Sequence, residues 1–406
     1  MTFVGHRRSI RPRRLASAFI VALAALTLAL TAAGCTRDSD AAPADNKTIT
    51  VFFTNDVNGE QSPCGCKSNP SGGLAKRATL LAKVRSENEN VLVFDVGNQM
   101  HPHPMVEKTN PAMEAERADL FVKSLNAMHY TAAVPGALDM ALGADTFKSL
   151  LAQAEYPMLG GNVYVKGEKT PLLKDSMIVE AAGYKIGLVG VVDNELIWRK
   201  MPVKLPTFEI RGPKAYLKTT LSAIAPKVDF ILLLAHMDLE RLKEMPLDAA
   251  GDKLAFVLSS NNQRRLFQDV NVVDKIPTLQ LPPRGREVGV LTIAPTGDNF
   301  KFKNRSELSR AQTRLNQFEA MAKRMETQAG DEGVAEYYKD SPSSLERYEG
   351  YKDKIEEQKK AIEDLSGPGS FFELRNVNLG EDVTGDAAIK GWVAAFEAEY
   401  PEARTP

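Results

Sequence analysis

Cysteine and histidine are scarce in this sequence of 406 residues, which has three cysteines and five histidines. Two of the cysteines form the sequence Cys64-Gly65-Cys66, and no Cys-x-x-Cys motif is present. Covalent haem attachment, which needs that spacing, is therefore excluded. If the chain lies outside the cytosol, we expect Cys64 and Cys66 to form a disulfide, because Gly65 lets the small ring close. A free dithiol or a metal-binding pair is the alternative.

The sequence also lacks an excess of positive charge. Its formal net charge is −1, and removing the five arginines of the first 34 residues lowers it to −6. A nucleic-acid-binding domain usually carries a basic patch, so we do not expect this chain to bind nucleic acid. The hydrophobic fraction of 43 % is ordinary for a globular protein, and the length allows one large domain with additions.

The N-terminus has the pattern of a secretory signal. Five arginines precede an apolar run over residues 15–30, and Thr-Ala-Ala-Gly then leads into Cys35. The end of this segment resembles a bacterial lipobox, in which the cysteine takes a diacylglyceryl group and becomes the mature N-terminus. We expect a signal peptide over residues 1–34 and a flexible tether over residues 35–47, which are short and polar. An uncleaved anchor helix is the alternative.

The resemblance to a lipobox implies a lipoprotein of the bacterial cell envelope, attached to the membrane through Cys35. Each buried acyl CH₂ contributes ~0.8 kcal/mol, so two or three chains hold a protein on a membrane. Thr36 follows the cysteine in place of the Asp that often signals retention in the inner membrane. This favours the outer membrane.

Apolar strands alternate with amphipathic helices from residue 48 onward. Strands are predicted at residues 48–54, 90–97, 184–192 and 228–236, with shorter strands from 254 to 304. Helices are predicted at residues 73–87, 112–128 and 213–224. Near-continuous apolar strands separated by helices predict an α/β domain with buried sheets.

The pattern changes at residue 305, where apolar residues begin to repeat at the spacing of a coiled-coil seam. Two amphipathic stretches within residues 305–366 are separated by a polar break, which predicts an antiparallel helical hairpin. The hairpin either packs its own seams together or binds a partner. Residues 367–406 should return as a strand and a final helix, capped by Asp386, that packs on the body.

Residues 48–304 resemble the N-terminal metallophosphoesterase domain of the 5′-nucleotidase and UDP-sugar hydrolase family, within the calcineurin-like superfamily. The motifs that carry the resemblance, in the family's order, are "FTNDVNG", "GGLAKRATLLAKVR", "VLVFDVGNQ", "VPGALDMALG", "LGGNVY", "IGLVGVV" and "LLLAHMD". The resemblance implies a four-layer α-β-β-α sandwich. The helical hairpin stands where the family's separate C-terminal substrate-binding domain is expected.

The resemblance also implies two divalent metals that activate a water, but most ligand positions are substituted here. Asp56 matches the first Asp ligand, and His236 matches a His ligand. The substituted ligand positions are Asn58 for His, Asn98 for the bridging Asp, Ala137 for Asn, and Asn261 and Gln263 for the closing histidines. Leu138 replaces the His that assists the leaving group.

These substitutions remove charge and an acid from the implied site. The amide of Asn98 is neutral, and Leu138 has no proton to give to a leaving alkoxide. Amide side chains carry both donors and acceptors, so they can hydrogen-bond to one another where relatives bind metal. We therefore expect no cofactor and a catalytically degenerate phosphoesterase fold that acts as a binding or scaffold protein.

Two other hypotheses stay open. His101 and His103, in "MHPHP", could combine with Asp56 and His236 to hold one zinc or manganese ion. The chain would then be a periplasmic phosphoesterase of the nucleotidase type with a remodelled metal site. We favour instead a Pro-rich surface loop whose histidines are solvated. In the other hypothesis the helical hairpin binds a protein partner, and the α/β body presents it.

Replacing the predicted lipid-bearing residue tests the anchor. Cys35→Ser should move the protein from the detergent phase to the aqueous phase of a phase-separation assay, because the acyl chains are lost. Unchanged membrane retention would instead favour an uncleaved anchor helix.

Overall fold

The computed structural model of the protein describes residues 48–64, 70–260 and 270–404. The predicted signal peptide and tether, with Cys35, lie outside these residues, as do Cys66, Asn261 and Gln263. The chain divides into residues 1–45 and a compact unit, 46–406, that contains every described element. Within the described residues, no helix is long and apolar enough to cross a membrane.

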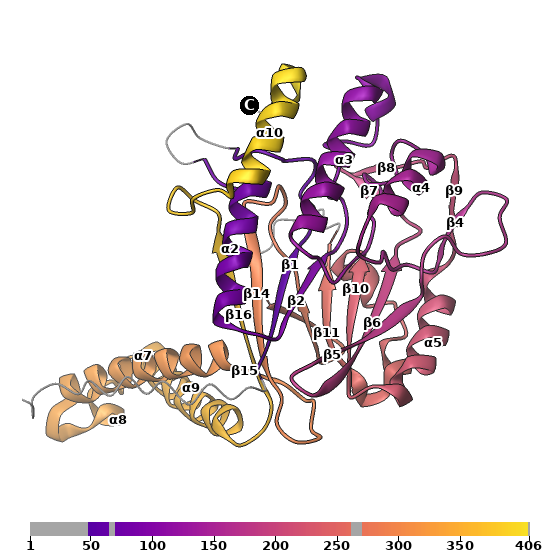
Figure 1. Ribbon diagram of the computed structural model, residues 1–406. Coiled ribbons are helices and arrows are strands. Elements are labelled where there is room, and N and C mark those ends of the chain that lie inside the picture. The colour runs from indigo at the N-terminus through magenta and orange to yellow at the C-terminus, as the bar shows by residue number, and fades with distance from the viewer. Residues whose placement is uncertain (1–47, 65–69, 261–269, 405–406) are drawn as a thin grey trace, which may run out of the picture. The chain divides into compact units, whose positions relative to one another are not determined.

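The first of two six-stranded sheets is built around β1 and β2 (Figure 1). Its strands, in spatial order, are β15 (Lys303–Asn304), β16 (Phe371–Asn378), β14 (Glu287–Ala294), β1 (Ile49–Thr54), β2 (Val91–Asp95) and β3 (Ala132–Ala133). β1, β2 and β3 are parallel, whereas β14 pairs antiparallel with β1 and with β16. The three parallel strands therefore end at the same edge of the sheet.

The second sheet has a parallel centre with an antiparallel strand at each edge. Its strands, in spatial order, are β12 (Val270–Val273), β13 (Ile276–Leu279), β11 (Leu254–Ser259), β10 (Phe230–His236), β6 (Tyr184–Val192) and β5 (Ser176–Ala181). β6, β10, β11 and β13 are parallel, and β5 and β12 pair antiparallel with their neighbours. β6, β10 and β11 are apolar and buried on both faces, as expected for strands covered by another layer on each side.

Helices cover the outer face of each sheet, so the fold has four layers. On the side of the first sheet lie α2 (Leu74–Glu87), α3 (Pro111–Ala127), α4 (Ala144–Gln153) and α10 (Ala387–Glu399) (Figure 1). On the side of the second sheet lie α5 (Pro213–Ile224), η2 (Ala225–Lys227), α6 (Leu239–Leu242) and η3 (Leu247–Lys253). One large core joins the two sheets to the first set of helices, and a smaller core joins the second sheet to α5. The predicted α-β-β-α fold class is confirmed.

An aromatic cluster joins the two sheets and corrects one prediction. The segment at residues 299–304 was expected to be a strand, but only β15 forms there. Phe302 instead packs against Phe230 and Phe256 of the second sheet, with ring centroids 5.7 and 5.0 Å away. Phe256 in turn contacts Phe372 of the first sheet at 5.1 Å. The alternating phenylalanines therefore reflect packing between the sheets and not a longer strand.

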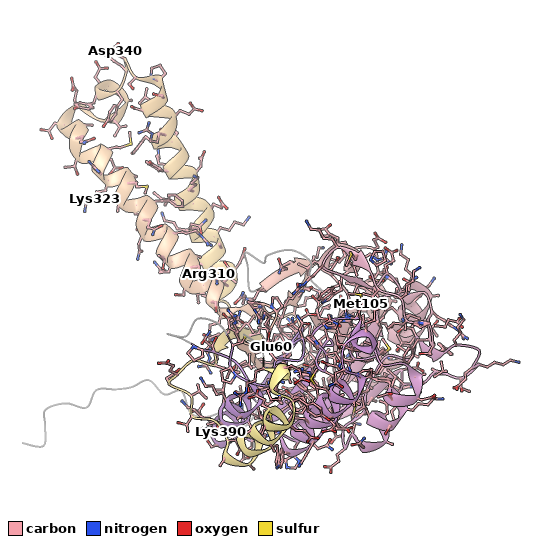
Figure 2. The ribbon with its side chains drawn as sticks, turned by 90° about the horizontal axis from the view of Figure 1, so that it is seen from above. Glu60, Met105, Arg310, Lys323, Asp340 and Lys390 are labelled. Atoms are coloured by element: carbon pink, nitrogen blue, oxygen red, sulfur yellow. The ribbon has the colours of Figure 1, made fainter. Side chains whose placement is uncertain are left out.

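Two long helices connect neighbouring strands of the first sheet. α7 (Arg305–Ala329) follows β15, and α9 (Pro342–Ser366) leads back into β16, with η4 (Gly330–Glu332) and α8 (Val334–Tyr337) between them. α7 and α9 pack along each other, with the rings of Phe318 and Tyr351 stacked at 6.4 Å. Arg310 and Lys323 lie along α7, and Asp340 lies at the turn before α9 (Figure 2).

Several short elements do not follow from the periodicity of the sequence. These are α4, the edge strand β5, the pairs β4 (Val163–Val165) with β9 (Phe208–Ile210) and β7 (Ile197–Trp198) with β8 (Met201–Pro202), and the 3-10 turns η1 (Val106–Lys108) and η5 (Pro401–Ala403). A strand of two or three residues is too short to show an alternating pattern, because its pairing is set by its neighbours.

The C-terminal helix begins with the predicted cap. The Oδ1 atom of Asp386 accepts a hydrogen bond from the backbone N–H of Ile389 at 2.9 Å. Asp386→Ala should cost α10 about 1 kcal/mol, because that N–H loses its partner. We expect amide hydrogen exchange in α10 to become about fivefold faster, whereas Glu381→Ala, at an exposed residue before the helix, should change nothing. Equal exchange in the two variants would contradict this role of Asp386.

Candidate functional site

The residues of the implied metal site gather where β1 and β2 of the first sheet and β10 of the second sheet end. The turn after β1 and the loop after β2 pair through their backbones. Asp56 N–H donates to the carbonyl of Gly97 at 2.9 Å, and Asn58 N–H donates to the carbonyl of Asn98 at 2.7 Å. Asp56, Asn58 and Asn98 all have positive φ, between 46° and 56°. Asn and Asp tolerate this conformation better than most residues, so the sequence suits these turns.

A buried carboxylate holds the loop after β2 to the turn after β3. Asp139 Oδ1 accepts the backbone N–H groups of Gln99 and Met100 at 2.7 and 2.8 Å. Its Oδ2 atom accepts those of Asn98 and Gly136 at 2.8 and 2.7 Å. Burial raises the pKa of Asp139, and these N–H groups oppose that rise because they favour the charged form.

The side chain of Asn98 fills the position implied for a bridging metal ligand. Its Nδ2 atom donates to Oδ1 of Asp56 at 2.9 Å, and its Oδ1 atom accepts the backbone N–H of Leu138 at 3.0 Å. The close approach depends on Gly136, where an added Cβ would lie 2.3 Å from Asn98 Oδ1. Asp56 and Asn98, expected to be near one another, are therefore in direct contact.

His236 ends β10 as a buried, neutral imidazole. Burial lowers its pKa to about 4, and a hydrogen bond to the backbone of Val96 opposes the shift only in part. Its Nδ1 atom lies 2.7 Å from Ser260 Oγ, and its Nε2 atom has no hydrogen-bond partner. Gly97 is required beside it, because a Cβ there would lie 2.7 Å from Nδ1.

His101 does not lie on a solvated surface loop, so that interpretation was wrong for this residue. Its side chain is fully buried, and its Nδ1 atom lies 3.0 Å from Oε2 of Glu114 on α3. Arg117 Nε also donates to Glu114 at 3.1 Å. Burial alone would raise the pKa of Glu114, but His101 and Arg117 outweigh it and hold the pKa below its ordinary value. The Nε2 atom of His101 has no partner.

The other substituted positions are apolar or unpaired. Ala137 and Leu138 are buried in the turn after β3, and Asn58 Oδ1 is buried without a hydrogen-bond partner. His103 is partly exposed, and its Nδ1 atom accepts the backbone N–H of Met105 at 3.3 Å. Asn261 and Gln263 lie outside the described residues, so their place at the site stays a prediction.

The described residues do not fit a pair of divalent metals. Such a pair needs several carboxylate or imidazole ligands facing one point. Across residues 48–64, 70–260 and 270–404, no group of three or more His, Cys, Asp or Glu side chains could hold an ion. His101 and His103 are therefore not brought together with Asp56 and His236 as a four-ligand site.

Cys64 is buried and has no disulfide partner among the described residues. The other member of the predicted disulfide, Cys66, lies outside them. The Cys64–Cys66 disulfide therefore stays a prediction.

Comparison with known proteins finds similar chains and folds, although no family model matches the chain. A 5′-nucleotidase of Diplobatis ommata is 27 % identical over 201 residues, covering 45 % of this chain and 31 % of that protein. A 5′-nucleotidase of Vibrio vulnificus is 25 % identical over 241 residues, covering 57 % of this chain and 41 % of that protein. The crystal structure of a 5′-nucleotidase precursor from Thermus thermophilus superposes with a TM-score of 0.57 at 14 % identity, covering 87 % of this chain and 59 % of that one.

The four-layer fold is that of the calcineurin-like metallophosphoesterases, as expected from the sequence. The similarity to these 5′-nucleotidases supports the resemblance that the motifs of the sequence carry. The chain spans less than half the length of the curated relatives just described.

Two important site residues were not singled out in the sequence. Asp139 lies in the motif "GALDMALG", one position after Leu138, but its role rests on backbone N–H groups that no side-chain pattern reveals. Asp95 ends β2 beneath the site, where Thr54 donates to its carboxyl at 2.6 Å. Burial raises the pKa of Asp95 to about 8, so this carboxyl is largely uncharged at neutral pH. The sequence signal that could have identified Asp95 is an acidic residue at the end of an apolar strand.

Asp139→Asn tests the contact that holds the site loops together. Asparagine keeps one acceptor atom but turns an NH₂ group towards two of the four N–H donors. Each buried N–H left unsatisfied costs ~1–3 kcal/mol, so we expect the free energy of unfolding in urea to fall by about 2–6 kcal/mol. The exposed Asp353→Asn on α9 is the matched control and should stay within about 0.5 kcal/mol. Equal stability of the two variants would contradict the proposed role of Asp139.

Proposed function

We propose that this chain is a lipid-anchored relative of the 5′-nucleotidases that has lost phosphoester hydrolysis and acts as a binding or scaffold protein. One observation carries the proposal. The Asn98 side chain, at the implied bridging position, donates directly to Asp56, the first implied ligand, at 2.9 Å. A donor N–H therefore faces the carboxylate that a metal ion would have to bind.

The electrostatics of a metal pair explain why this substitution matters. Two dications about 3.5 Å apart repel each other by roughly 19 kcal/mol at an effective dielectric of 20. A bridging carboxylate offsets part of that repulsion, and the neutral amide of Asn98 does not. His236 adds no negative charge, since its imidazole is neutral at pH 7. The described part of the site supplies too little charge for two ions.

The implied leaving-group acid is also lost. Leu138 is fully buried, and its backbone N–H is already bonded to Asn98. An alkoxide leaving from this position would find no proton donor there. The substitutions at Asn98 and Leu138 therefore affect both the binding of the metal pair and the protonation of the leaving group.

Attachment to the cell envelope rests on the sequence around Cys35. The basic segment, the apolar run and the Ala-Ala-Gly-Cys sequence support a lipid anchor, and Thr36 supports the outer membrane. In this proposal the short tether over residues 35–47 keeps the α/β body close to the membrane. The hairpin of α7 and α9 is a second surface that such a scaffold could offer to a protein partner.

A remodelled metal site is the second candidate, and one observation favours it. His101 and His236 each have Nδ1 in a hydrogen bond and a buried Nε2 without a partner. Histidines that bind metals commonly donate their other ring N–H in this way. Two nitrogens alone make a weak site, so this candidate needs a further ligand from outside the described residues.

A hydrolysis assay separates the two candidates. The purified full-length protein should not cleave nucleotides, UDP-sugars or aryl phosphates above background with Mg²⁺, Mn²⁺, Co²⁺ or Zn²⁺. Asn98→Asp alone should restore nothing, because the metals need most of their ligands together. Metal-dependent turnover that disappears in His236→Ala or His101→Ala would overturn the proposed loss of hydrolysis and establish the second candidate.

A further inference from the structure

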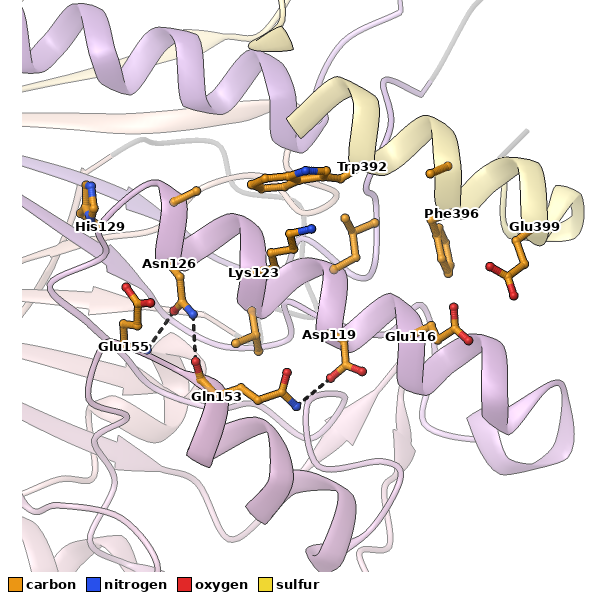
Figure 3. Close-up of a pocket in the computed structure, with 14 residues that line it drawn as sticks. Glu116, Asp119, Lys123, Asn126, His129, Gln153, Glu155, Trp392, Phe396 and Glu399 are labelled. Carbon is orange, nitrogen blue, oxygen red and sulfur yellow. Dashed lines mark hydrogen bonds between the residues drawn. The ribbon is translucent and has the colours of Figure 1, made fainter. Parts of the chain in front are cut away.

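A groove of about 830 Å³ lies between α3 and α10, formed by helices that flank the first sheet and not by the ends of its strands. Figure 3 shows α10 along one side, α3 along the other, and Gln153 and Glu155 from the end of α4 beyond α3. None of the residues assigned above to the metal site lines it. The groove is therefore a feature of its own.

The shape of the groove suits an elongated ligand. Its lining residues on α3 run from Glu116 to Ala127, which is about 16 Å along a helix rising 1.5 Å per residue. Residues along its sides, including Asp119 and Lys123, are exposed. A small molecule usually needs a pocket that encloses most of its surface, whereas an open groove between two helices can bind a third helix.

The floor of the groove is aromatic. Phe396 is buried on α10, and Trp392, one turn earlier on the same face, packs against the core but is only partly buried. Arg117 stacks on Phe396 at 5.4 Å, and Lys123 Nζ lies 4.1 Å from the centroid of the Trp392 ring. A partly exposed Trp beside a buried Phe is the kind of anchor that dominates binding at protein interfaces.

The rim of the groove is acidic. Glu116, Asp119, Glu155 and Glu399 line it, against one lysine, Lys123, whose charge lies over the Trp392 ring. All four carboxylates belong to exposed residues. The groove therefore complements a ligand that combines apolar groups with several positive charges.

Hydrogen bonds fix the walls before any ligand binds. Gln153 Nε2 donates to Asp119 at 3.0 Å, and Asn126 Nδ2 donates to the carbonyl of Gln153 at 2.8 Å (Figure 3). The hydroxyl of Tyr400 donates to Glu116 at 2.9 Å, which ties the end of α10 to α3. A preformed groove loses little conformational entropy on binding.

We propose that this groove binds a basic amphipathic helix of a partner protein. The apolar face of that helix lies on Trp392 and Phe396, and its lysines and arginines meet the acidic rim. The proposal does not depend on the loss of hydrolysis, since the groove and the metal site share no residue.

Tryptophan fluorescence tests the proposal on the full-length protein in non-ionic detergent. Trp198→Phe leaves Trp392 as the single tryptophan. The probe is a synthetic 14-residue helix with leucines on one face and lysines on the other, compared with the same peptide carrying glutamate in place of lysine. The lysine peptide should shift the Trp392 emission to shorter wavelength with saturation, and the glutamate peptide should not.

Charge reversal in the groove gives the matched comparison. Glu155→Lys combined with Glu399→Lys should weaken binding of the lysine peptide at least tenfold, whereas Glu332→Lys, in η4, should leave it unchanged. Equal binding of the two peptides, no saturable shift, or no effect of the charge reversal would overturn the proposal. A shift that depends on protein concentration without peptide would also overturn it, because the groove would then hold a second copy of the chain. The comparison of peptides stands even if a charge-reversal variant fails to fold.

Discussion

Four backbone N–H groups converge on the buried carboxylate of Asp139, and the edge of the first sheet depends on that contact. It joins the loop after β2 to the turn after β3, and so sets the distance between Asn98 and Leu138. A metal pair would otherwise be the natural organiser of these loops, since its ligands come from both. In this structure an internal carboxylate holds both of them. The contacts that hold these loops in place are therefore distinct from the metal ligands that hydrolysis would need.

Because the loops are held by Asp139, the implied metal-ligand positions can be substituted together while the fold is retained. Asn98 donates to Asp56 on one side and accepts from Leu138 on the other, so its own amide is paired without a bound ion. His236 is neutral, and Asp95, at the end of β2, is largely protonated at pH 7. The site thus retains its outline but carries little of the negative charge that divalent ions require.

Long, periodic elements could be predicted from the sequence, and contacts between distant residues could not. The helix predicted over residues 213–224 is α5 to the residue, because its apolar spacing and Pro213 define both its face and its start. α4 and the short strand pairs were missed, since their pairing is decided by neighbouring segments. His101 looked exposed because it precedes Pro102, whereas its partner Glu114 is supplied by α3. The final helix packs on the body as predicted, but the sequence did not show that Trp392 is left partly exposed beside the groove between α3 and α10.

The metal content of the protein tests the central claim most directly. The full-length chain is purified without added metal, incubated with Zn²⁺ and Mn²⁺, dialysed, and measured by elemental analysis. The account predicts far less than one ion per chain, the same in the wild type and in His236→Ala, because Asn98 and Asp56 already satisfy each other. About two ions per chain, the number that the family's hydrolytic chemistry uses, would contradict it.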